Sequence, residues 1–199
     1  MIRPLDAADA AAFQTLRLRG LRESPEAFGS TYEEEAGVPL GEIAARLARG
    51  AGGEDVVFGA VDGEGVLVGV AGLRRDSHRK ARHRAHVWGM YVAPEARGRG
   101  LGRALLESLI AHARTLAGVE RLTLSVVPDN RAARSLYLRL GFVSYGVERQ
   151  AYCLDGEYWD SEHMALVLIS PSRVLLNKML YFFHKILACD RFLSQRERL

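Results

Sequence analysis

Three glycines at alternate positions, Gly98, Gly100 and Gly102, mark the stretch of this chain whose residues most clearly suggest chemistry. They follow an apolar run typical of a buried strand and precede an apolar pattern typical of a helix. Glycine lets backbone N–H groups approach an anion closely, and a helix N-terminus adds partial positive charge. Three arginines suited to phosphate oxygens stand beside the turn: Arg97, Arg99 and Arg103. The pattern predicts a pyrophosphate site, with an ordinary glycine-rich turn as the alternative.

Two familiar phosphate loops do not fit this spacing. A dinucleotide-binding Gly-x-Gly-x-x-Gly turn needs a third glycine where this chain has Arg103, and it follows the first strand of its unit rather than lying in mid-chain. A nucleoside-triphosphate loop ends in Gly-Lys-Ser/Thr, and no such triplet occurs near the turn. The pyrophosphate therefore belongs to some other ligand.

A second patterned stretch follows, at residues 122–142. An apolar strand leads into Asn130-x-x-Ala133-x-x-Leu136-Tyr137-x-x-x-Gly141-Phe142. The two stretches, in this order and at this distance, resemble the two signature motifs of the GNAT superfamily of N-acetyltransferases. The resemblance covers residues 1–169, and it implies acetyl-coenzyme A as the acetyl donor, with no metal.

The resemblance also implies how the donor is held. The thioester carbonyl meets a backbone N–H at a bulge near the end of the preceding strand, an oxyanion device made of main chain that maps to Met90, Tyr91 and Val92. Asn130 binds the pantetheine arm or a water, and its place at a helix start also suits a plain N-cap. The turn that takes the pyrophosphate comprises Arg97, Gly98, Arg99, Gly100, Leu101, Gly102 and Arg103.

Tyr137 is the residue that the resemblance assigns as general acid. In the family the matching tyrosine donates its proton to the departing thiolate. A phenol with an ordinary pKa of about 10 can do this because the pKa of the leaving thiol lies close to it. Taken alone, a tyrosine at helical spacing would instead indicate a core residue.

The group that removes the amine proton is less sharply defined by the sequence. His86 lies on the strand before the turn and, by strand alternation, is expected to share a face with Trp88 and Met90. Histidine titrates near neutrality, which suits a base, although a structural histidine, satisfied in the sheet or exposed, is the favoured interpretation. The run Glu33-Glu34-Glu35, the pair Asp160 and Glu162, and ordered water are further candidates.

The acceptor is predicted to be the primary amine of a small molecule. Relatives that acetylate the N-termini of ribosomal proteins usually carry Glu where this chain has Ser125. A protein or peptide acceptor, and a non-catalytic module that senses acyl-coenzyme A, remain as alternatives. The basic loop 74–84 lacks the interleaved aromatic residues of a nucleic-acid surface and is expected to be a solvated hairpin tip, so no nucleic acid partner is predicted.

Composition sets the bounds of the fold. The chain has 199 residues, 48% of them hydrophobic, which is enough for one domain with a sizeable core. Its two cysteines give neither a disulfide framework nor a metal-binding spacing. The residues at 1–6 do not resemble a leader, and no apolar run is long enough to span a membrane, so a cytoplasmic location is expected.

The local patterns predict an α/β fold in which a central, mostly antiparallel mixed sheet of six to seven strands is flanked by helices. A first helix is capped by Asp6 or Asp9 and is interrupted at Ser24-Pro25. Further helices are predicted at 40–49, from the glycine turn to about 116, and at 130–140. Strands are predicted at 2–4, 55–61, 66–73, 84–92, 122–126, 142–153 and 157–168.

The last thirty residues, 170–199, are predicted to lie outside the acetyltransferase-like domain of 1–169. Apolar residues recur there at steps of three and four, which indicates a C-terminal amphipathic helix. The segment has a net charge of +4, against −1 for residues 1–169. Packing on its own domain or on a partner subunit in a homodimer is the favoured interpretation, and contact with a membrane surface is the alternative.

Overall fold

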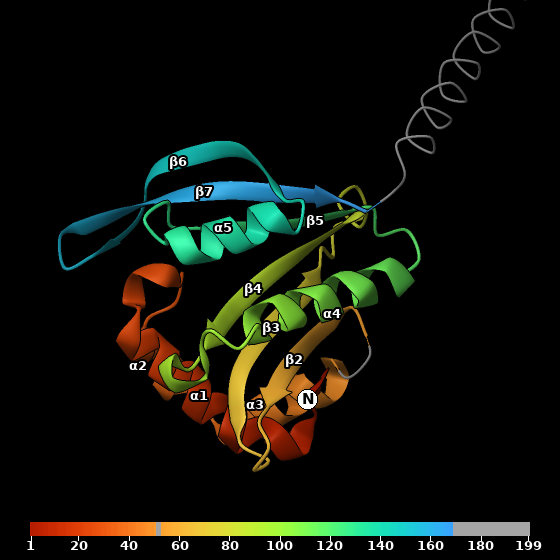
Figure 1. Ribbon diagram of the computed structural model, residues 1–199, viewed down its shortest axis with the longest axis vertical. Helices are drawn as coiled ribbons and strands as arrows, with labels where there is room; N and C mark the ends of the chain where they lie inside the picture. The colour runs from red at the N-terminus through yellow and green to blue at the C-terminus, as the bar shows by residue number, and fades with distance from the viewer. Residues whose placement is uncertain (51–52, 169–199) are drawn as a thin grey trace, which may run out of the picture. The chain divides into compact units, whose positions relative to one another are not determined.

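The described part of the chain, residues 1–50 and 53–168 of a computed structural model, is built around one seven-stranded sheet. The strands lie in the order β1-β2-β3-β4-β5-β7-β6 (Figure 1). The neighbours β1–β2, β2–β3, β3–β4 and β6–β7 are antiparallel, and β4–β5 is parallel, which confirms the predicted mixed sheet. The strands are β1 (Ile2–Pro4), β2 (Asp55–Val61), β3 (Leu67–Arg75), β4 (Arg84–Val92), β5 (Arg121–Val126), β6 (Val143–Leu154) and β7 (Glu157–Val167).

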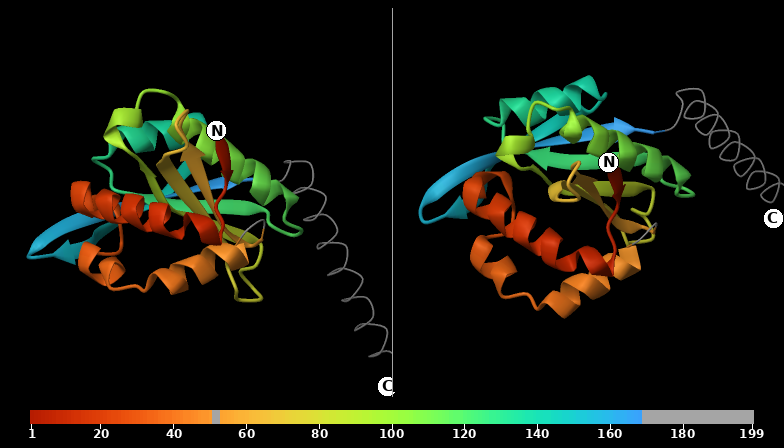
Figure 2. Two further views of the ribbon diagram at one scale, coloured as in Figure 1. Left: turned by 90° about the horizontal axis from the view of Figure 1, so that it is seen from below. Right: turned by 60° about the horizontal axis from the view of Figure 1, so that its bottom comes forward.

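Helices cover both faces of this sheet. Figure 2 shows α1 to α3 on one face and α4 and α5 on the other. We call these the α1–α3 face and the α4–α5 face. The helices are α1 (Ala10–Glu23), α2 (Tyr32–Ala36), α3 (Leu40–Gly50), α4 (Leu101–Thr115) and α5 (Arg131–Arg139).

The core on the α4–α5 face follows from the apolar pattern of α4. Leu105, Leu106 and Leu109 are fully buried, and they recur at the spacing of one helix face. Burying each of these side chains contributes about 1.5–3 kcal/mol relative to leaving it in water. This packing fixes α4, and therefore the glycine turn at its start, against the sheet.

The core on the α1–α3 face is a second apolar cluster. Phe13 and Leu16 of α1, Leu47 of α3, and Tyr91 of β4 belong to it. The chain enters α1 through a 3-10 turn at Ala7–Asp9, where the Asp6 carboxylate accepts a hydrogen bond from the Ala8 N–H at 2.8 Å. Asp6 thus caps the 3-10 turn, whereas Asp9 is the N-cap residue of α1 itself and forms no side-chain cap bond there.

The short helix α2 was not predicted from the apolar pattern. It begins with a capping box, in which Thr31 Oγ1 accepts from the Glu34 N–H and the Glu34 carboxylate accepts from the Thr31 N–H at 2.8 Å. At five residues, α2 is too short for hydrophobic periodicity to reveal it.

The predicted C-terminal helix at 170–199 lies outside the described residues. Residues Met1–Leu166 form one compact unit, and all of the features below belong to it. No helix within residues 1–50 and 53–168 is both long enough and apolar enough to cross a membrane.

Candidate active site

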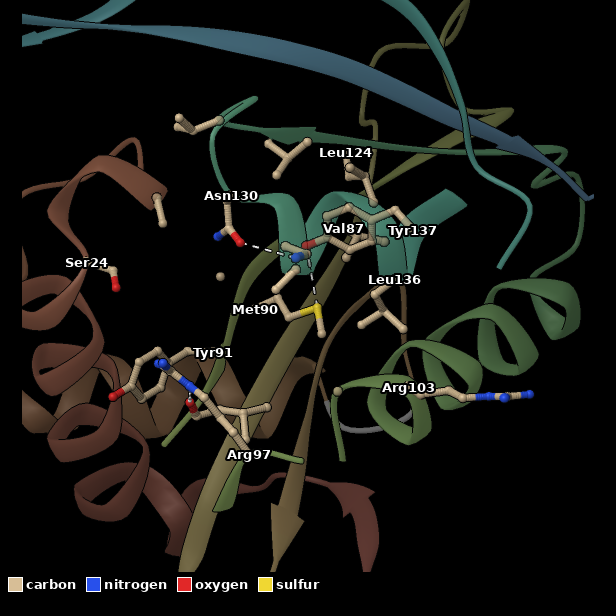
Figure 3. Close-up of a pocket in the computed structure, with 18 of the residues that line it drawn as sticks. Ser24, Val87, Met90, Tyr91, Arg97, Arg103, Leu124, Asn130, Leu136 and Tyr137 are labelled. Carbon is tan, nitrogen blue, oxygen red and sulfur yellow. Dashed lines mark hydrogen bonds between the residues drawn. The ribbon is translucent and has the colours of Figure 1, made fainter. Parts of the chain in front are cut away.

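The two central strands β4 and β5 separate part of the way along the sheet. Their pairing runs from Arg84 opposite Arg121 to His86 opposite Thr123. Beyond that point lies a pocket of about 860 Å³ (Figure 3). It is lined by residues 87–92 of β4, by residues 124–126 of β5, and by Val127, which follows β5. Because β4 and β5 are no longer paired there, a ligand can enter between the two strands.

A β-bulge lies on β4 at this opening. Val70 pairs with Tyr91 and Gly72 with Trp88, so Gly89 and Met90 together stand opposite Ala71. Gly89 has φ +63°, a left-handed conformation that glycine adopts readily. Because two residues oppose one, a backbone group on the bulged strand is left without its partner in the ladder. The bulge predicted near the end of this strand is present, one residue earlier than expected.

The bulge overturns one prediction about side-chain direction. His86, Trp88 and Met90 were expected to share a face, but the extra residue reverses the alternation after Trp88. Trp88 packs against the core on the α1–α3 face, whereas Met90 turns towards α4 and α5, where it contacts Tyr137. The shared-face prediction is therefore wrong for Met90.

The glycine turn forms one end of the pocket. Gly98 and Gly100 both have φ +75°, and no atom lies within 4 Å of the position that a Cβ would take at either. Gly100 is the N-cap of α4 and forms no side-chain cap, so the first-turn N–H groups of the helix have no partner from the cap residue. Gly102 is needed for close packing, because a Cβ there would lie 3.1 Å from Met90 Cε. An open, uncapped turn of this kind fits a pyrophosphate.

The three arginines of the turn differ in their surroundings. Arg97 lines the pocket, donates from Nε to the Val92 carbonyl at 3.0 Å, and has its guanidinium 5.9 Å from the ring centre of Tyr91. Arg103 pairs with Glu107 at 2.8 Å, and Figure 3 shows its side chain pointing away from Tyr137. Arg99 is exposed to solvent. Arg97 therefore has the position best suited to fixing the turn.

Tyr137 of α5 lies across the pocket from the turn. Its side chain is buried, and its hydroxyl donates to the sulfur of Met90 at 3.5 Å (Figure 3). Burial raises the pKa of Tyr137 to about 12, because the phenolate would lose its water. The hydroxyl therefore keeps its proton at neutral pH. The acceptor of its hydrogen bond, the Met90 thioether sulfur, is a weak one.

Asn130 is the N-cap of α5, as its sequence position predicted. Its side-chain oxygen accepts from the Ala133 N–H at 3.1 Å, which leaves the carboxamide nitrogen outside that bond. Asn130 also lines the pocket, between the turn after β5 and Tyr137.

Tyr91 and Val92 lie at the end of β4, beside the bulge. The Tyr91 hydroxyl donates to Glu23 of α1 at 2.5 Å, and a Cβ at Gly20 would lie 3.0 Å from its ring. Burial, together with this carboxylate, raises the pKa of Tyr91 to about 12. The side chain thus ties β4 to α1, and any contact of Tyr91 or Val92 with a donor would come from the main chain.

His86 lies where β4 and β5 are still paired. Its Nδ1 is 3.2 Å from Thr123 Oγ1, and His86 is not among the described residues that line the pocket. Partial desolvation and the charges of Arg74 and His163 lower the pKa of His86. The structure therefore does not bring His86 together with Tyr137.

The acidic residues suggested as bases are mostly engaged elsewhere. Glu34 belongs to the capping box of α2, and Glu35 pairs with the buried Arg17 at 3.0 Å. Asp160 pairs with Arg149. Glu162, which is buried, accepts from Arg134 Nε at 2.6 Å, and this contact lowers the pKa of Glu162. These four residues each have a structural partner, whereas Glu33 is exposed on α2.

Three polar side chains that contact one another in a row reach the pocket, and the sequence did not predict this arrangement. Ser125 of β5 lines the pocket, and its Oγ lies 3.0 Å from Nδ1 of His163. Nε2 of His163 lies 3.0 Å from Oε2 of Glu148. The three residues come from β5, β7 and β6, and their contacts depend on a strand order that no local pattern reveals.

The strand, bulge, glycine turn and helix thus line the same pocket as the buried phenol of Tyr137. The chain belongs to the acetyltransferase (GNAT) family, whose model matches residues 19–142.

Two curated relatives show the range of acceptors. The chain is 40% identical over 93 residues to the N-alpha-acetyltransferase RimI of Mycobacterium tuberculosis, a match that spans 46% of this chain and 55% of the relative. It is 28% identical over 85 residues to the spermidine N(1)-acetyltransferase of Vibrio cholerae, spanning 43% of this chain and 49% of the relative. The chain thus spans about half the length of these relatives.

Among solved structures, the chain is similar to the yncA protein of Salmonella typhimurium with its cofactor acetyl-CoA. The two share 26% identity and a TM-score of 0.69, over 85% of this chain and 94% of that one.

Proposed function

We propose that this protein is an N-acetyltransferase that moves acetyl from acetyl-coenzyme A to the primary amine of a small molecule, by direct attack in a ternary complex. The observation that carries the proposal is that one pocket is lined both by the glycine turn and by Tyr137. A pyrophosphate held at the turn and a proton donor across the pocket suit the two ends of a coenzyme A thioester.

The donor would supply an acyl group that is already activated as a thioester. The first-turn N–H groups of α4, from Leu101 to Arg103, would bind the pyrophosphate, and Arg97 would steady the turn. The bulge at Gly89 and Met90 offers main-chain N–H groups for the developing oxyanion. Asn130 would orient the pantetheine arm.

Tyr137 would act as the general acid at the end of the transfer. Its Oη holds a proton at neutral pH, and within the described part of the chain that proton is donated to a thioether sulfur. Turning to a thiolate would therefore exchange a weak acceptor for a strong, charged one.

The identity of the acceptor separates two versions of the proposal. The relative RimI, an N-alpha-acetyltransferase, supports a peptide acceptor. Ser125, which stands where such enzymes usually carry Glu, supports a small-molecule amine, as does the likeness to a spermidine acetyltransferase. We favour the small molecule.

A direct test measures thiol release by the full chain from acetyl-coenzyme A across a panel of polyamines, amino acids, amino sugars and peptides with free N-termini. We expect at least one small amine to support turnover. Turnover with peptides alone would replace the small-molecule version by the peptide version. Acetyl-coenzyme A binding without release for any amine would contradict the enzyme proposal and indicate a sensor.

Tyr137→Phe tests the acid within the same assay. It should bind acetyl-coenzyme A as the wild type does and lower kcat by about 100-fold or more, the usual contribution of general acid catalysis. Unchanged turnover would show that Tyr137 is only a core residue.

A further inference from the structure

We infer that Ser125, His163 and Glu148 form the relay that removes the proton from the attacking amine. This inference rests on the proposed function, because it assigns the relay to the acylation of an amine. It begins from the unbroken chain of contacts, 3.0 Å from Ser125 Oγ to His163 Nδ1 and 3.0 Å from His163 Nε2 to Glu148 Oε2.

The hydrogen-bond chemistry fixes a direction for the relay. A carboxylate can only accept, so neutral His163 donates its Nε2–H to Glu148. Nδ1 of His163 then carries a lone pair and accepts from the Ser125 hydroxyl. Ser125 Oγ is left with lone pairs for a donor in the pocket, and an amine N–H is such a donor.

The relay reaches the pocket from the face opposite the acid. Glu162 of β7 binds Arg134 of α5, so it points to the α4–α5 face. Side chains alternate along a strand, and therefore His163 points to the α1–α3 face. Tyr137 enters the pocket from α5. The proton donor and the proton acceptor thus lie on opposite faces of the opening between β4 and β5.

The surroundings of His163 are partly polar and open to water. Its side chain is 30% exposed and that of Glu148 is 61% exposed, so a proton can leave the relay to solvent. Tyr145 of β6 stacks on the imidazole with ring centres 5.9 Å apart, and Arg121 of β5 lies 4.9 Å from the ring of that tyrosine. His86 of β4 is a further titratable neighbour, and Glu148 is the carboxylate that contacts His163 among residues 1–50 and 53–168.

The proton and electron balance of the transfer is complete with these groups. The amine nitrogen forms a bond to the acyl carbon and loses one proton to Ser125 Oγ, which passes its own proton to His163 Nδ1. The C–S bond breaks with its electron pair on sulfur, and Tyr137 Oη donates a proton there. The imidazolium of His163 then releases its proton to water, and Tyr137 regains one.

The chain offers a matched control for this relay. Thr123 lies two residues before Ser125 on the same face of β5, and its Oγ1 contacts a histidine, His86, at 3.2 Å. This second hydroxyl–imidazole pair lies where β4 and β5 are still joined, and Thr123 is not among the described residues lining the pocket. Removing the Ser125 hydroxyl in one variant and the Thr123 hydroxyl in another distinguishes loss of a proton relay from a general disturbance of β5.

The experiment compares Ser125→Ala, His163→Gln, Ser125→Thr and the control Thr123→Val, with the amine that gives the highest turnover in the panel. Ser125→Ala and His163→Gln should lower kcat/KM by about 100-fold, with acetyl-coenzyme A affinity and Tm retained. Ser125→Thr keeps the hydroxyl and should restore most of the activity. The pH dependence of kcat/KM in Ser125→Ala and in His163→Gln should differ from that of the wild type, because the groups that take up the amine proton are then missing.

Other outcomes overturn the relay. Wild-type pH profiles in Ser125→Ala and His163→Gln would show that the contacts are only a polar row between strands. A loss in Thr123→Val as large as that in Ser125→Ala would move the base to the His86 side. If the wild type itself releases no thiol with any amine, the proposed function fails, and the relay fails with it.

Discussion

Replacing Gly100 by alanine tests whether the glycine turn is built for an anion. Gly100 has φ +75°, where a residue with a Cβ pays about 1–2 kcal/mol, and no atom lies within 4 Å of the new methyl group. The free energy of unfolding should therefore fall by about that amount, through backbone strain alone. In the complex, however, the methyl group would stand at the start of α4, where a pyrophosphate has to approach.

The effect on binding should exceed the effect on stability. A hydrogen bond from a backbone N–H to a charged oxygen contributes about 1.5–3 kcal/mol, and losing one weakens binding about ten- to a hundredfold. Titration calorimetry with coenzyme A measures this change, and urea unfolding measures the strain.

Gly65→Ala is the control for this change. Gly65 lies in the hairpin between β2 and β3, has φ +83°, and also has no atom within 4 Å of the new methyl group. It should show the same strain with unchanged coenzyme A affinity. Equal affinity of Gly100→Ala and the wild type, or equal weakening in both variants, would refute the assignment of the turn.

Two further changes test the packing around the site. Gly72→Ala should destabilise the protein by about 1–3 kcal/mol in urea unfolding, because its Cβ would lie 2.3 Å from the ring of Trp88; an unchanged midpoint would contradict this packing. Arg134→Met should lower the free energy of unfolding at pH 7, because it leaves the Glu162 carboxylate buried without its cation. Arg134 holds the pKa of Glu162 below its ordinary 4.5, so the stabilisation is present above pH 4.5 and is lost as pH falls through the lowered pKa. The difference in stability between wild type and variant should shrink over that range, and a constant difference would disprove the coupling.

The elements that position the donor site could be predicted because their signals are local. The bounds of β2 and β4 agree with those expected, and the glycine turn leads into α4 as its spacing indicated. Asn130 caps α5 in the same way. Each of these features depends on residues that are neighbours in the chain.

The acceptor side could not be predicted in the same way. The bulge reverses the direction of Met90, and its one local signal was Gly89, a glycine inside an apolar strand. The contact of Ser125 with His163 joins residues 38 positions apart, and it exists only because β7 lies beside β5. Pairing of distant strands follows from tertiary packing, which sequence periodicity does not report.

The division of the pocket between main chain and side chains has a consequence for engineering. The proposed donor contacts come from backbone conformation, at Gly89, Gly98 and Gly100, and most substitutions elsewhere leave that conformation alone. Ser125 and its neighbours on the other face present side chains instead. A mutant library that keeps Ser125 and varies its neighbours on that face is therefore expected to change which amine is accepted while the proposed acetyl donor is kept.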